Sequence, residues 1–238
     1  MYGRERIPID TFNTIWNSLD WSVPMNLLLG IIPALLCITL HELSHGLAAY
    51  CLGDPTAKNH GRLTLNPLRH LDVRGLLMMV VFHFGWAKPV PVNMNRFRNP
   101  KRGMAITALA GPFSNLVIAA VFLLLYGFFY LPLSMNGSYL ADSVLTMLHT
   151  TAYLSISLAV FNLLPIPPLD GSKILFSVLP DSAYRKLMRY ERYGMILLIL
   201  LILAGSMSDT INSVVYYCYD KLFFLADFAF RLATSIFL

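Results

Sequence analysis

The chain has 238 residues, of which 56% are hydrophobic and 13% are charged, and its mean hydropathy is +0.60. Soluble domains carry about 25% charged residues, and a chain of this length cannot bury so many apolar side chains in one core. The composition therefore excludes an ordinary soluble domain and indicates an integral membrane protein. The net charge of +5 does not indicate nucleic-acid binding, because nine of the 18 Lys and Arg residues lie together between positions 53 and 104. Such clustering is typical of an orientation signal.

The first apolar segment covers residues 24–52 and is long enough to cross a membrane with some tilt. The positions before it do not match a cleavable signal peptide, because no apolar core directly follows their basic residues. A Gly-Asp-Pro sequence at 53–55 is predicted to end the helix. The next apolar run, residues 75–87, is shorter than the roughly 20 residues of a helical crossing. We therefore expect a re-entrant or interfacial segment there, with both ends on one side of the membrane.

Two further full spans are predicted at residues 103–133 and 140–165, and a fourth near 193–207. The tail, residues 216–238, either crosses the membrane or lies in the interface as an amphipathic helix. The expected fold is thus an all-α polytopic membrane protein with about four to six transmembrane helices. A re-entrant or short β-hairpin segment is expected between the first and second full spans.

The whole chain, residues 1–238, is predicted to form a single membrane-embedded domain, with a core at 24–190 and C-terminal helices at 193–238. The connection between the second and third spans has no Lys or Arg, whereas residues 53–104 and 171–192 are both basic. The positive-inside rule then places these two basic segments in the cytoplasm. We expect a multi-pass protein of the plasma membrane.

The sequence HELSH, residues 41–45, lies inside the first apolar span. His41 and His45 are four residues apart, about 40° around a helix axis, so both imidazoles can reach one metal ion. Glu42 can reach a metal-bound water as a general base without being a ligand. Lining of a polar bundle interior is the alternative, but ionisable residues within a membrane span are usually functional. The motif therefore predicts one Zn²⁺ per chain.

A catalytic zinc usually takes three protein ligands, so a third ligand is needed at a similar depth. Asp170 follows a proline-rich stretch at the cytoplasmic end of the third span, where a broken helix would let a short carboxylate turn inward. The same residue could instead be the N-cap of a helix that begins near Ser172, and spacing alone does not decide between the two. His60, His70 and His83 are the other candidates, although histidines in loops or interfaces are more often solvated.

Two asparagines lie in the later predicted spans. Asn115 and Asn162 could stabilise a tetrahedral oxyanion or hold a substrate backbone, or they could link helices by hydrogen bonds. Gly111 and Pro112 fit a helix start or a kink, where a small residue permits close packing.

The stretch WAKPVPVN, residues 86–93, alternates apolar residues and prolines in the manner of an extended chain. Proline is tolerated at a sheet edge, so this stretch could form a hairpin that dips into the membrane and pairs with an unwound substrate at Val90 and Val92. An ordinary proline-rich surface turn is the alternative. A change of charge or bulk at either valine that left cleavage intact would contradict the pairing.

Three motifs in this order resemble the site-2 protease family of intramembrane zinc metalloproteases. They are HELSH, AGPFSN at residues 110–115 and NLLPIPPLDG at residues 162–171. Residues 61–72 and 84–103 also look like the linking segments of its small bacterial members, and the match covers roughly residues 24–190.

This resemblance implies that His41, His45 and Asp170 bind zinc and that Glu42 is the catalytic base, acting on a zinc-bound water. It implies an active site below the cytoplasmic surface and substrates that are transmembrane or near-membrane segments of other proteins, cleaved in regulated intramembrane proteolysis. The chain shows no room for the PDZ or CBS domains of larger relatives.

The resemblance favours an intramembrane endopeptidase over two other classes. A catalytically silent homologue that only binds membrane segments would have no use for Glu42. A metal transporter would need several acidic or histidine sites along a path, and apart from His149 the interiors of the spans carry only the one cluster. The expected partners are therefore membrane-protein substrates and the lipid bilayer, with no nucleic acid. The sequence indicates no oligomeric state.

Overall fold

The computed structural model describes residues 22–72, 75, 86–205 and 208–237. Within these ranges the regular elements are helices, which confirms the predicted all-α class, and one isolated antiparallel bridge joins Leu71 to Ala87. The elements are α2 (Ser22–Cys51), α3 (Thr56–Asn59), η1 (Pro67–Arg69), η2 (Met94–Arg96), α5 (Pro100–Ser134), α6 (Tyr139–Asn162), α7 (Asp170–Ser177), α8 (Asp181–Leu203), α9 (Ser208–Leu222) and α10 (Phe224–Phe237).

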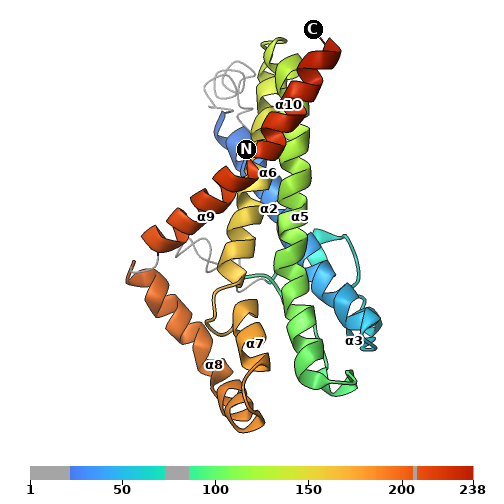
Figure 1. Cartoon of the computed structure of the whole chain (residues 1–238), viewed down its shortest axis with the longest axis vertical. Coiled ribbons are helices and arrows are strands. Elements are labelled where there is room, and N and C mark those ends of the chain that lie inside the picture. The colour runs from blue at the N-terminus through green and yellow to red at the C-terminus, as the bar shows by residue number, and fades with distance from the viewer. Residues whose placement is uncertain (1–21, 73–74, 76–85, 206–207, 238) are drawn as a thin grey trace, which may run out of the picture.

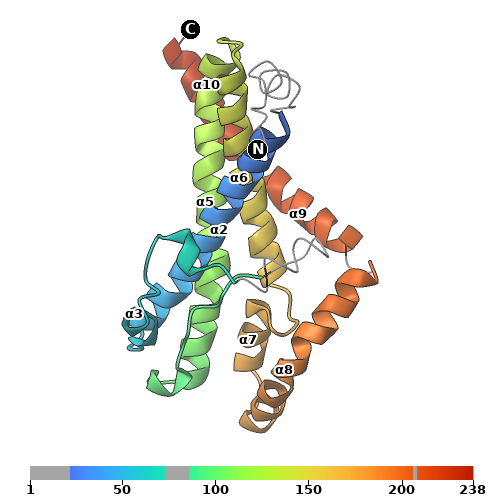
Figure 2. The same cartoon turned by 180° about the vertical axis from the view of Figure 1, so that it is seen from behind.

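Helices α2, α5 and α6 form the centre of the molecule and lie together along its long axis (Figures 1 and 2). Among the described residues they are the three helices long and apolar enough to cross a membrane, and they coincide with the three predicted full spans. Helix α5 begins before the predicted position because Asn99 caps it, accepting a hydrogen bond from the Arg102 N–H, and Pro100 suits the first helical position. Ser138 caps α6 in the same way through the Ala141 N–H.

Helix α5 does not start at Gly111 and Pro112, as one reading of the sequence suggested. It runs through Pro112 from its start at Pro100. Proline removes one backbone hydrogen bond inside a helix, but here the ring is buried among neighbouring helices. Packing therefore outweighs the local preference of proline for a helix start.

The C-terminal part departs most from the sequence prediction. Helix α8 begins at Asp181, well before the predicted start near residue 193, and its apolar part, Tyr193–Ile202, is shorter than a crossing. The tail forms α9 and α10 in place of one helix. Helix α10 packs closely along α5, since a Cβ added at Gly127 would lie 2.0 Å from the Ala226 carbonyl oxygen. The number of crossings beyond three remains a prediction.

The segment between α2 and α5 passes back towards α2. Residues 76–85, most of the predicted re-entrant run, lie outside the described residues, so the hairpin remains a prediction. On either side of them, the Leu71–Ala87 bridge is accompanied by a 2.8 Å hydrogen bond from the Lys88 N–H to the His70 carbonyl. The chain beyond Lys88 leads to η2 and then to the start of α5.

Candidate metal centre

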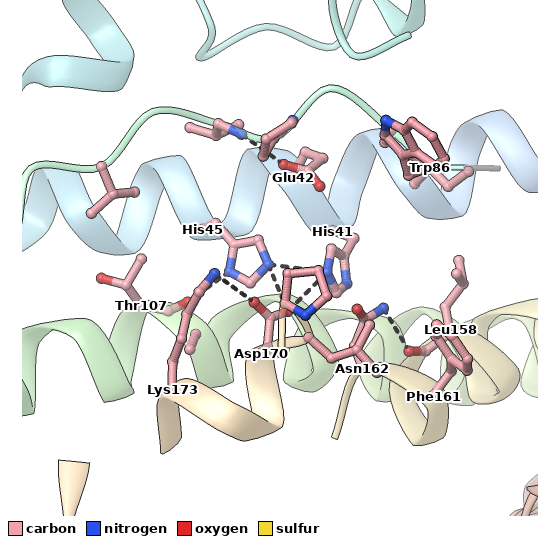
Figure 3. A pocket seen from close by; sticks show the side chains of 18 of the residues that line it. His41, Glu42, His45, Trp86, Thr107, Leu158, Phe161, Asn162, Asp170 and Lys173 are labelled. Atoms are coloured by element: carbon pink, nitrogen blue, oxygen red, sulfur yellow. Dashed lines mark hydrogen bonds and ion pairs between the residues drawn. The ribbon is translucent and has the colours of Figure 1, made fainter. Parts of the chain in front are cut away.

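Three side chains converge between α2 and the start of α7 (Figure 3). The Nε2 atoms of His41 and His45 are 3.0 Å apart, and Oδ2 of Asp170 lies 3.3 Å from the first and 3.0 Å from the second. A tetrahedral zinc ion with ligand bonds of about 2.0–2.1 Å separates its ligand atoms by about 3.3 Å. All three residues are buried. The triangle therefore fits one face of a zinc tetrahedron, formed from the ligands that the sequence suggested.

A backbone carbonyl of α5 fixes the orientation of His45. Its Nδ1 lies 2.7 Å from the Thr107 carbonyl oxygen, which can only accept a hydrogen bond, so Nδ1 carries the proton. When a metal is bound, Nε2 carries no proton and its lone pair points to the centre of the triangle. Such a partner on the other ring nitrogen is the usual support of a metal-binding histidine.

Asn115 supplies the equivalent partner for His41. Its side-chain amide lies 3.2 Å from His41 Nδ1, and its Oδ1 is buried without a hydrogen-bond partner among the described residues. The O and N of an amide are assigned from hydrogen bonding. When His41 binds a metal through Nε2, its Nδ1–H needs an acceptor, and turning the amide brings Oδ1 to that position. The orphaned oxygen thus gains a partner when a metal is bound, which supports the fit of the site to zinc.

Asp170 is the first residue of α7, and Leu169 holds the N-cap position, so the N-cap alternative is wrong. Its two oxygens are used differently: Oδ2 faces the imidazoles, while Oδ1 lies 3.6 Å from Lys173 Nζ. Burial acts to raise the pKa of Asp170, but its hydrogen bonds with the two histidines, and then the charge of Lys173, hold that pKa well below its ordinary value. The carboxylate is therefore ionised, as a metal ligand must be.

Two glycines let the helices approach the site. A Cβ at Gly111 would lie 2.4 Å from His45 Cε1 and Nε2 and 2.6 Å from His41 Cε1. A Cβ at Gly171 would lie 2.2 Å from the Leu163 carbonyl oxygen, so α7 packs against the end of α6. The sequence suggested close packing at Gly111, but it did not indicate that the packing partners are the two imidazoles.

Glu42 lies about 100° around α2 from His41 and faces the extended segment after residue 86 (Figure 3). Its Oε2 accepts a 3.0 Å hydrogen bond from the Val90 N–H. One turn further along α2, a Cβ at Gly46 would lie 3.2 Å from Val90 Cγ1, and the Val90 side chain is buried. The helix thus uses one face for the ligands and a second face to receive this segment.

A cavity of about 570 Å³ contains the three ligands, Glu42 and residues from all the surrounding elements. Val90, Val92 and Asn162 line it. The Asn162 Nδ2 donates to the Leu158 carbonyl of its own helix. Asn115 is fully buried behind His41 and is not among the residues that line the cavity.

The other candidate ligands lie elsewhere. His70 is buried and its Nε2 contacts the Thr64 carbonyl oxygen at 2.9 Å, and His60 follows α3 at an exposed position. His83 lies outside the described residues. Within the described part of the chain, the cluster of His41, His45 and Asp170 is the group of such residues close enough to hold a metal ion.

Comparison with known proteins agrees with this geometry. The sequence model of peptidase family M50 matches residues 131–205. The chain is 40% identical over 177 residues to "Putative zinc metalloprotease YwhC" of Bacillus subtilis, covering 72% of this chain and 78% of that protein. It is 28% identical over 214 residues to "Putative zinc metalloprotease Rip2" of Mycolicibacterium smegmatis, covering 86% of this chain and 80% of that protein. No solved structure gives a significant match.

The match to YwhC extends over most of both proteins, and the family model covers the Asp170 region with the helices on either side of it. This agreement confirms the resemblance read from the three motifs and zinc as the cofactor. The chain belongs to peptidase family M50, the site-2 protease family, and is a zinc metalloprotease.

Proposed function

We propose that this protein is an intramembrane endopeptidase, which hydrolyses peptide bonds in or near transmembrane segments of other membrane proteins during regulated intramembrane proteolysis. One observation carries the proposal: the ligand cluster and Glu42 share a largely apolar cavity whose walls include the three helices of spanning length. A protease of soluble substrates would have no need for a site in this position.

The residues of the cavity divide the chemistry between them. His41, His45 and Asp170 hold zinc, which when bound supplies a Lewis acid that activates water and polarises the scissile carbonyl. Glu42 takes the proton from the attacking water and delivers it to the leaving amine. The geometry favours a positioning function for Asn115, through His41, over direct contact with an oxyanion. Asn162 faces the cavity, and we propose that it contacts the substrate.

Substrate binding is proposed to use the extended segment at residues 86–93. Val90 and Val92 lie on the cavity wall with the metal ligands, so a chain paired with their backbone would pass the zinc site. An extended substrate forms main-chain hydrogen bonds with such an edge, and because these bonds do not involve side chains, substrates of many sequences can bind.

The charge distribution supports the proposed orientation. The segments that flank the site, residues 53–104 and 171–192, are the basic ones, which by the positive-inside rule supports a site near the cytoplasmic face of the plasma membrane. Fusing a reporter that is active only in the cytoplasm after residue 136, and another after residue 180, tests this topology. The first fusion is expected to be inactive and the second active.

The proposed reaction is tested with the purified chain in liposomes. A panel of single-pass membrane proteins with trimmed outer domains is incubated with wild type and with Glu42→Gln, and mass spectrometry locates the new termini. New termini within or beside the transmembrane segments, absent with Glu42→Gln at equal zinc content, are the expected result. Cleavage restricted to loops far from the membrane would contradict the proposal.

A further inference from the structure

The extended segment beside the site has few backbone donors. Between Ala87 and Asn93 only Lys88, Val90 and Val92 have an N–H group, because the other two residues are prolines. The Lys88 N–H donates to the His70 carbonyl, next to the Leu71–Ala87 bridge. Among the described residues, the backbone pairing between this segment and the chain at His70 and Leu71 stops there, because the preceding residues, Pro67–Arg69, form the helix η1.

The next donor along this edge is bound by a side chain. The Val90 N–H donates to Glu42 Oε2 at 3.0 Å, so the proposed catalytic base occupies the position at which a further strand would place a carbonyl oxygen. Hydrogen bonds to ionised acceptors are stronger than neutral ones. The Val92 N–H has no acceptor among the described residues. Among the described residues, Glu42 thus occupies the donor of Val90, while that of Val92 is unoccupied.

The segment itself is anchored on both sides of Val90. Arg62 Nη2 donates to the Lys88 carbonyl at 2.6 Å, and the Asn93 N–H donates to buried Asp54 Oδ2 at 2.6 Å. The Val90 side chain is held against Gly46. The segment is thus fixed in place, whereas the half-buried Glu42 side chain has rotatable bonds, so Glu42 is the group that moves when another acceptor reaches Val90.

We infer that Glu42 and the backbone of an extended substrate compete for the Val90 N–H, and that pairing of the substrate with this edge releases Glu42 to act as the base. This inference rests on the proposed function. The carbonyl of the bound chain replaces Glu42 Oε2 at Val90, and the freed carboxylate turns to the water at the metal centre. Binding of an extended chain and activation of the base are then one event, and a chain that cannot pair at Val90 leaves the base engaged.

The competition is measured by equilibrium binding, without relying on activity. The probe is a fluorescein-labelled hexapeptide of alternating valine and threonine, a pattern that favours extended structure. A second peptide is N-methylated at every residue, so that methyl groups lie along both of its edges and hinder pairing sterically. Binding to the full-length, zinc-loaded chain in detergent is followed by fluorescence anisotropy, and mass spectrometry verifies that the peptide stays intact.

Glu42→Ala is expected to bind the hexapeptide about three- to tenfold more tightly than wild type, the range that one net hydrogen bond supplies. Val90→Pro removes the donor and is expected to bind more weakly than Val90→Ala, which keeps it. In the Val90→Pro background, Glu42→Ala is expected to change nothing. The N-methylated peptide is expected to bind Glu42→Ala and wild type with equal affinity.

Unchanged or weaker peptide binding by Glu42→Ala would overturn the inference. So would a Glu42→Ala gain in affinity that is as large in the Val90→Pro background as in wild type. Glu42→Gln separates charge from hydrogen bonding, since it removes the charge and keeps an acceptor. A gain equal to that of Glu42→Ala would mean that charge alone is responsible and would also overturn the inference. If Glu42→Ala and Val90→Pro affect peptide binding independently while wild type cleaves membrane proteins, only the proposed competition is wrong. If the effects of the two substitutions on peptide binding are coupled but no membrane protein is cleaved, the proposed function is wrong.

Discussion

Gly111 shows how closely α5 approaches the metal ligands. Because a Cβ there would come within 2.4 Å of His45 and 2.6 Å of His41, Gly111→Ala must displace both imidazoles. We expect zinc affinity to fall about 10- to 100-fold, the loss typical of disturbed ligand support. Zinc per chain after dialysis against a metal buffer measures the loss. Gly30→Ala in α2 is the matched control, because a Cβ there meets nothing within 4 Å, and it should keep its zinc.

Asn115 is expected to hold His41 in the metal-binding tautomer. Asn115→Leu removes the acceptor for Nδ1–H, and a loss of zinc affinity of about 10-fold or more should follow. Asn115→Asp keeps an acceptor oxygen and should retain more zinc than the leucine variant. Asn162→Ala removes a side chain of the cavity wall whose amide donates to the Leu158 carbonyl of its own helix, and this variant should bind zinc like wild type. Equal zinc content in Asn115→Leu and wild type would show that His41 does not depend on this amide.

Asp54 ties the end of α2 to the segment beside the cavity. Burial acts to raise its pKa, but hydrogen bonds from Thr56 and Asn93, with the charge of Arg96, hold that pKa below its ordinary value. A lowered pKa in the folded state means that the stabilisation is complete above the unfolded pKa, about 3.9, and is lost as the pH falls through the folded value.

Asp54→Asn is therefore expected to cost about 1–3 kcal/mol at pH 7, as for hydrogen bonds to a charged group. The difference from wild type should shrink below about pH 4. Denaturant unfolding in detergent at several pH values gives the two free energies of unfolding. If the difference in free energy of unfolding between Asp54→Asn and wild type stays constant down to pH 2.5, the loss of stability comes from packing and not from the charge of Asp54.

Gly127 lets α10 approach the backbone of α5 closely. A Cβ at Gly127 would overlap the Ala226 carbonyl, so Gly127→Leu should separate α10 from α5 and expose the α10 residues between them. We expect faster proteolysis within Phe224–Phe237 by an added protease, with zinc content unchanged because the ligands lie elsewhere. Gly30→Ala again serves as control. Protection of α10 equal to wild type would show that this contact does not hold the tail.

The sequence predicted the three long apolar helices and the pairing of His41 with His45 because each has a strong local signal, whereas for Asp170 spacing alone left the N-cap alternative open. Apolar length marks α2, α5 and α6, and the i, i+4 spacing puts His41 and His45 on one face. The remaining features depend on tertiary contacts. No local pattern distinguishes Gly111 as a packing surface for imidazoles, or joins the Thr107 carbonyl to His45. Helix α8 was placed too late because its first half is basic, and hydropathy alone does not detect a helix of that composition.

The metal centre links distant parts of the molecule, since α2 supplies two ligands, α7 the third, and α5 orients both histidines. Zinc binds the folded arrangement and stabilises it, by about 4 kcal/mol at a concentration 1,000-fold above Kd. We expect a chelator to lower the unfolding temperature of wild type, and to have no effect on the His41→Ala/His45→Ala variant. An equal shift in both would mean that the chelator acts elsewhere.

Asp170 enters the site only because Gly171 lets α7 seat against the end of α6. During synthesis, the two histidines are therefore inserted in the membrane long before the third ligand is made. A nascent chain that has not yet placed α7 lacks the third ligand of the candidate zinc site. The order of the ligands along the chain thus delays completion of this site until α7 has packed.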